Sequence, residues 1–139
     1  GEHSHRCIIP QPSFPDFFPD RIAAHFVPGR FFARSRELFP LVTELIVSTW
    51  NADSYLSAGT YGVAFGHEAS EKLSADITTK LGVHDIYFPI HRRFGNTVSA
   101  SVPLAMSLAQ EEGCLERGDR VLVIVGSAGI SVGFATFTF

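Results

Sequence analysis

Residues 121–139 read VLVIVGSAGISVGFATFTF and carry no charged side chain over nineteen positions. A block rich in β-branched residues comes first, glycines interrupt it at 126–129, and residues that favour strands follow. The length would suit a membrane-spanning helix, but the glycines break the apolar run in its middle. Two buried strands joined by a glycine turn account for the whole pattern.

Helical and strand-like patterns alternate upstream of this pair. Apolar residues recur at helical spacing in two segments, and short apolar runs separate the segments. Such alternation is typical of an α/β domain with a largely parallel sheet, here closed by an antiparallel final pair. The expected helices span 38–50, 69–81 and 101–112, and the expected strands span 6–9, 61–65, 86–90, 121–125 and 131–139.

Two details of these helices can be stated from spacing alone. Pro40 must either lie in the first turn of the first helix or kink it, because proline lacks the N–H that a helix interior uses. On the second helix, Glu68 and Lys72 are four residues apart and are expected to form a favourable ion pair.

Composition limits the classes of protein that this chain can represent. It has 139 residues, 45% of them hydrophobic, and a formal net charge of -3. This apolar content predicts one folded domain, and the lack of a basic surplus argues against a nucleic-acid or anionic-membrane partner. Residues 1–6 are polar and do not resemble a signal peptide. With Cys7 and Cys114 as its two cysteines, we expect reduced thiols and a cytoplasmic location.

Candidate site residues follow the predicted strands, where ligands gather in open α/β sheets. His67 lies after the expected strand 61–65, and Asn96 lies in a loop after the next expected strand, 86–90. A glycine-rich turn occupies 126–133. Each also has an ordinary interpretation. His67 could be a partly buried histidine, Asn96 a capping or loop residue, and the glycine turn a simple connection between strands.

Four segments resemble β-ketoacyl-acyl-carrier-protein synthase III, one of them more faintly than the others. Residues 67–73 (HEASEKL) resemble its His-Gln-Ala-Asn-x-Arg-Ile segment, and residues 94–105 (FGNTVSASVPLA) resemble its Tyr-Gly-Asn-Thr-Ser-Ala-Ala-Ser-x-Pro-x-Ala segment. Residues 126–139 are similar to its glycine-rich loop and final strand, and residues 27–32 are a fainter match to the start of a long helix. The resemblance extends over nearly the whole chain, but only to the carboxyl half of such an enzyme.

The resemblance implies a fold and an activity. The family belongs to the thiolase superfamily, whose members have two similar halves, each with a five-stranded mixed sheet and helices on both faces. Residues 1–139 would form the carboxyl half, and an amino half would carry the nucleophilic cysteine. The implied reaction is decarboxylative condensation of an acyl-coenzyme A with a malonyl thioester on acyl carrier protein, in a homodimer, without a metal or redox cofactor.

The resemblance also implies roles for individual residues. His67 and Asn96 would hold the malonyl thioester carbonyl and stabilise the enolate oxygen that decarboxylation leaves. Backbone N–H groups of Ala128 and Gly129 would serve a second oxyanion on the acyl thioester. Ser70 and Lys72 replace the family's Asn and Arg, and would contact coenzyme A or the carrier protein. Glu68 replaces the family's Gln.

The chain itself offers no convincing nucleophile. Cys114 has two acidic neighbours in sequence, which disfavour a thiolate, and Cys7 has no paired base nearby. His3, His5 and Cys7 alternate and could share one strand face as zinc ligands, but at a chain terminus we interpret this spacing as incidental. We therefore expect the isolated chain to be inactive and to associate through exposed apolar surface.

Alternative functions remain open at this point. The chain could be a fragment, a separate domain or a subunit of a split enzyme. The implied condensation could be of the fatty acid or the polyketide type. The complete protein could instead be a synthase III-like acyltransferase of secondary metabolism on the same fold, or a non-catalytic scaffold subunit. The sequence does not indicate the acyl chain length or the starter unit.

Overall fold

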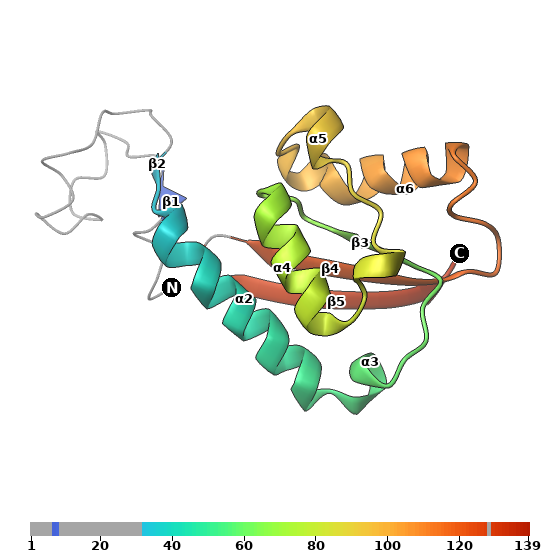
Figure 1. The fold of residues 1–139 in the computed structure, drawn as a ribbon, viewed down its shortest axis with the longest axis horizontal. Helices are drawn as coiled ribbons and strands as arrows, with labels where there is room; N and C mark the ends of the chain where they lie inside the picture. Colours follow the sequence, from blue (N-terminus) through green and yellow to red (C-terminus); the bar gives the residue numbers. More distant parts are fainter. Residues whose placement is uncertain (1–6, 9–31, 128) are drawn as a thin grey trace, which may run out of the picture.

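The computed structural model describes residues 7–8, 32–127 and 129–139 (Figure 1). In chain order the elements are β1 (Cys7–Ile8), β2 (Phe32–Ala33), α2 (Ser35–Ala52), α3 (Ser54–Ser57), β3 (Val63–Gly66), α4 (Glu71–Leu81), η3 (His84–Ile86), α5 (His91–Phe94), η4 (Val98–Ala100), α6 (Ser101–Glu111), β4 (Arg120–Ser127) and β5 (Ser131–Thr138).

The main sheet has the strand order β3-β4-β5. β3 runs parallel to β4, with Val63 opposite Val121 and Gly66 opposite Ile124. β4 and β5 are antiparallel along their full length, ending at the pair Ser127–Ser131. The predicted mixed sheet with an antiparallel final pair is therefore confirmed, and residues 121–139 form most of a β-hairpin. No helix in the described ranges is long and apolar enough to span a membrane.

The expectation of five strands in this sheet is wrong for the described residues, which contribute three. The predicted strand at 86–90 is reduced to one parallel bridge between Tyr87 and Ala64, where the N–H of Phe88 donates to the carbonyl of Ala64 at 3.0 Å. Pro89 follows immediately and has no N–H with which to extend a ladder. The predicted strand at 6–9 is present as β1, but it pairs with β2 outside the main sheet.

Two apolar clusters cover opposite faces of the sheet, because alternate residues of a strand point to opposite sides. Ala64 of β3 belongs to the cluster formed with α2 and α4. Val63 and Phe65 belong to the other, where Ala105 and Ala109 of α6 pack against them. Helices on both faces of the sheet are thus confirmed, as Figure 1 shows with α2 and α6 on opposite sides of the strands.

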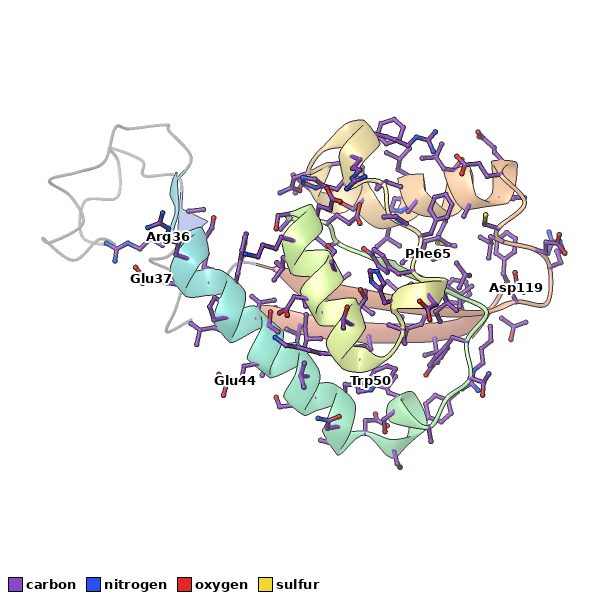
Figure 2. All side chains as sticks on the ribbon, in the orientation of Figure 1. Arg36, Glu37, Glu44, Trp50, Phe65 and Asp119 are labelled. Carbon is purple, nitrogen blue, oxygen red and sulfur yellow. The ribbon has the colours of Figure 1, made fainter. Side chains whose placement is uncertain are left out.

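The long helix α2 buries one stripe of side chains four residues apart: Leu38, Val42, Ile46 and Trp50. Figure 2 shows Trp50 on the sheet side of this helix and Glu44 on the opposite side. The helix begins at Ser35, so Pro40 lies inside it rather than in its first turn.

Candidate functional site

The carboxyl ends of β3 and β4 meet at one edge of the sheet, because these strands are parallel and in register. His67 follows β3 directly, and its backbone N–H donates to the carbonyl of Ile124 on β4 at 3.2 Å. The turn between β4 and β5 lies at this edge too. The sheet therefore brings two of the three sequence-predicted features to one place.

The half-buried His67 ring is held by the segment that precedes α6. Its Nδ1 lies 3.1 Å from the carbonyl oxygen of Val98 and 3.4 Å from Oγ of Ser101. The Ser101 hydroxyl itself donates to the same carbonyl at 2.8 Å. A carbonyl only accepts, so Nδ1 carries the proton. In the neutral ring Nε2 is then an acceptor, and it becomes a donor only when the ring takes a second proton.

The exposed side chain of Asn96 is oriented by Val98 as well. Its Oδ1 accepts the backbone N–H of Val98 at 2.9 Å, a local turn typical of asparagine. The interpretation of Asn96 as a loop residue is therefore confirmed, whereas the interpretation as a helix cap is wrong, because the caps of η4 and α6 are Thr97 and Ala100. Because the oxygen is the atom that must face this N–H, the donor end of the carboxamide is left for another partner.

Val98 thus joins the two predicted donors, since Asn96 binds its N–H and His67 binds its carbonyl. Its φ is 54°, in the left-handed region that a β-branched residue rarely adopts, and its side chain is 66% exposed. Such backbone strain occurs where surrounding contacts over-determine a conformation. Nothing in the sequence marks this position, because the site uses its main chain rather than its side chain.

The glycine turn has two separate reasons for glycine. Gly129 has φ 108°, a conformation that strains other residues. Gly126 has an ordinary φ, but a Cβ there would lie 2.6 Å from Cγ1 of Val42, because α2 packs closely on β4. The predicted role of the backbone at 128–129 stays a prediction, and Ala128 lies outside the described residues.

Ser70 and Lys72 lie on a groove of about 760 Å³ between α2 and α4. Ser70 is the N-cap of α4, and its Oγ accepts the N–H of Leu73 at 3.1 Å. Lys72 is exposed. The groove is lined by apolar and charged side chains, which include Phe39, Val47 and Leu73 together with Arg36, Glu44 and Asp76.

Glu68 does not form the surface ion pair with Lys72 that its spacing predicts. It is 1% exposed, and its Oε2 accepts the backbone N–H of Ile90 at 2.7 Å. The physical reason is that α4 begins only at Glu71, so Glu68 precedes the helix and helical spacing does not apply to it.

Tyr87 packs beside Glu68 and was also missed by sequence reasoning. Burial raises the pKa of its hydroxyl far above the usual range, and the nearby negative charge of Glu68 raises that pKa further. The hydroxyl lies close to Ser74 and to the carboxyl of Glu68. The one available sequence signal for the contact between Tyr87 and Glu68 was an acidic residue, Glu68, shortly after an apolar strand.

The remaining predicted candidates give no second site. Cys114 is exposed and forms no disulfide with a described residue, and its Sγ lies 3.9 Å from the carbonyl of Glu112. The described residues contain no group of three side chains able to hold a metal ion. His3, His5 and the side chain of Cys7, whose alternation was interpreted as incidental, lie outside the described residues.

Comparison with known families identifies the chain. A family model described as "3-Oxoacyl-[acyl-carrier-protein (ACP)] synthase III C terminal" matches residues 25–139. The chain belongs to this family. The resemblance that the motifs at 67–73 and 94–105 indicated is thereby confirmed.

Curated relatives agree with the family model. The chain is 30% identical over 113 residues to beta-ketoacyl-[acyl-carrier-protein] synthase III of Mesorhizobium japonicum, covering 76% of this chain and 34% of that protein. It is 31% identical over 80 residues to the synthase III of Clostridium tetani, covering 57% of this chain and 24% of that protein. The chain therefore spans about a third of the relatives' length or less.

Solved structures of a synthase III protein and of another protein share the fold. Beta-ketoacyl-[acyl carrier protein] synthase III from Thermus thermophilus aligns with a TM-score of 0.81 at 21% identity, over 100% of this chain and 43% of that one. An OleA variant from Xanthomonas campestris aligns with a TM-score of 0.77 at 20% identity, over 99% of this chain and 36% of that one. The synthase III C-terminal chain thus has a thiolase-like α/β fold.

Proposed function

We propose that residues 1–139 are the carboxyl half of a synthase III-like enzyme that condenses an acyl-coenzyme A with a malonyl thioester. In this proposal His67 and Asn96 act on the malonyl thioester. One observation carries it: both side chains hydrogen-bond to the backbone of Val98, at the edge where β3 and β4 end. The amino half would supply the nucleophilic cysteine.

The proposed chemistry follows from the two side chains. When malonyl thioester loses carbon dioxide, the electron pair of the breaking C–C bond moves into the thioester, whose oxygen becomes negative. The carboxamide N–H of Asn96 would donate to that oxygen at any ordinary pH. Because Val98 engages Nδ1 of His67, this ring would donate from Nε2 in its doubly protonated form. Preorganised donors of this kind stabilise a developing oxyanion strongly.

The enolate carbon would then attack the acyl thioester on the cysteine of the amino half, and the cysteine would leave as a thiolate. Backbone N–H groups at 128–129 are proposed to stabilise the oxyanion of that second step. Ser70 and Lys72 would contact coenzyme A or carrier protein. This role is supported by their position on the groove between α2 and α4.

We propose that the amino half covers the α6 face of the sheet. Val125 and Phe137 are 37% and 39% exposed there, although both lie in strands. Large apolar side chains exposed on a sheet face are typical of an interface. The complete protein would be a homodimer, as the family resemblance implies.

The decisive experiment uses the complete protein and separates a donor role of Asn96 from its turn-forming role. Asn96→Asp keeps an oxygen that can accept the N–H of Val98, but replaces the N–H₂ donor. We expect it to slow carbon dioxide release from malonyl thioester by roughly a hundredfold or more. Loading of the acyl group from coenzyme A should be unchanged, and so should the melting temperature. His67→Ala should slow the same step.

Asn51 provides the matched control, because it is an exposed asparagine at the end of α2. Asn51→Asp makes the same charge change far from Val98 and should alter neither step. An Asn96→Asp protein that releases carbon dioxide as fast as the parent would contradict the proposed role. A parent protein that neither loads nor decarboxylates is the result expected of a scaffold subunit.

A further inference from the structure

A carboxyl group lies buried beneath the candidate site. Glu68 follows His67 in the chain and is 1% exposed, so a substrate at the surface cannot touch it. A buried acidic side chain is costly unless its oxygens are satisfied. Its contacts therefore indicate why it is there.

Residue 68 binds the segment that leads to Asn96 at two points. The side-chain Oε2 accepts the N–H of Ile90 at 2.7 Å, and the backbone carbonyl of Glu68 lies 3.1 Å from Nδ1 of His91. The chain then makes the short helix α5 and reaches Asn96 through Gly95. Glu68 thus ties the residue after His67 to the start of the segment that carries Asn96.

Tyr87 lies beside Glu68. Its hydroxyl is buried close to the carboxyl of Glu68 and to Ser74 of α4. The fit is close, because a Cβ on Gly66 would lie 3.0 Å from the Tyr87 hydroxyl and 2.9 Å from the carbonyl of Ile124. Glycine at the end of β3 therefore admits the tyrosine beside the strand.

We propose that Glu68 is a positioning residue that sets the placement of Asn96 relative to His67. The inference rests on the proposed function, since it assigns Glu68 to the decarboxylation step. Removing its oxygens would leave the N–H of Ile90, which is 1% exposed, without its acceptor. The segment to Asn96 would then shift to find another partner. Small misplacements of this kind can cost up to roughly a hundredfold in rate.

The test compares variants of the complete protein. Glu68→Gln keeps an oxygen for Ile90 and an N–H₂ group that can donate to Tyr87. Carbon dioxide release should therefore stay within about threefold of the parent. Glu68→Leu fills the space without an acceptor. It should slow carbon dioxide release per folded molecule by about ten- to a hundredfold, while acyl loading stays unchanged.

The control is Arg92→Ala. Arg92 Nε and Glu71 Oε1, 2.8 Å apart, tie the same two segments at the surface, and the arginine side chain is 83% exposed. An exposed pair contributes little, so this variant should behave like the parent. Because Glu68 acts through Asn96, Glu68→Leu should add nothing to Asn96→Ala in the double variant.

Tyr87→Phe keeps the test decisive if Glu68→Leu does not fold, because it removes one hydroxyl without changing the ring. It should slow carbon dioxide release several-fold without affecting loading. The proposal is overturned if both variants release carbon dioxide normally, or if loading falls in parallel. Normal release by Asn96→Ala would instead reject the proposed function, and the positioning role with it. A slow Asn96→Ala beside a normal Glu68→Leu would reject the positioning role alone.

Discussion

Replacing Val98 should stabilise the protein, although the residue lies in the candidate site. Its φ of 54° is unfavourable for a β-branched side chain by about 1–2 kcal/mol. The side chain is 66% exposed, so little burial is lost when it is shortened. Asparagine enters the left-handed region more readily. We expect Val98→Asn to raise the free energy of unfolding by about 1 kcal/mol.

Val98→Gly should gain less. Glycine removes the strain, but its freedom in the unfolded chain offsets about 0.5–1 kcal/mol of the gain. Both variants keep the backbone N–H and carbonyl that Asn96 and His67 bind. Carbon dioxide release by the complete protein should therefore be retained in both.

Urea denaturation of the complete protein measures the effect, with Ser99→Asn as the control. Ser99 is the exposed neighbour of Val98 and has a negative φ. Its replacement should change the free energy of unfolding by no more than about 0.5 kcal/mol. The strain argument is refuted if Val98→Asn is no more stable than the parent, or if Ser99→Asn stabilises equally.

Two further predictions concern packing and pH. Gly126→Ala would place a Cβ 2.6 Å from Cγ1 of Val42 and 3.1 Å from Cδ1 of Ile46, and should cost about 1–3 kcal/mol of stability. Denaturation of Gly126→Ala/Val42→Ala should show a smaller loss than the sum of the singles, whereas strict additivity would mean that this contact is not the cause. Because burial raises the pKa of Tyr87 above its unfolded value of 10.0, the stability it contributes is complete below pH 10 and decreases above it. The decrease should be up to about 1.4 kcal/mol per pH unit. In unfolding measured from pH 9 to 11, Tyr87→Phe should reduce this loss of stability. Replacing the exposed Tyr55 by Phe should not reduce it. An unchanged slope in Tyr87→Phe would show that the burial argument fails.

The fold was predictable where local pattern alone determines the structure. In residues 121–139 the apolar runs and the glycines specify both strands and the turn between them, and the structure has this hairpin. The strand expected at 86–90 depends instead on how many backbone hydrogen bonds it can form with the adjacent strand. One bridge to Ala64 forms before Pro89 removes the next donor.

The sequence suggested the residue types of the candidate site but not the contacts that hold them. His67 and Asn96 were identified from the motifs that carry them, and their contacts with one residue agree with a shared site. Glu68 was misassigned because its role depends on where α4 begins. Ser70 caps that helix, so Glu68 turns inward instead of following the helical repeat.

The role of Val98 could not be predicted from the sequence, and the reason is physical. The site uses its N–H and its carbonyl, which every residue except proline provides, so chemistry does not determine the side chain there. The left-handed φ would favour glycine or asparagine, yet valine is present. Its conformation is maintained by hydrogen bonds from His67 and Ser101 to its carbonyl and from its N–H to Asn96. At about 0.5–1.5 kcal/mol each, these bonds are together large enough to offset the strain. The side chains proposed to act on the substrate are therefore also the ones that keep Val98 in the conformation that orients them.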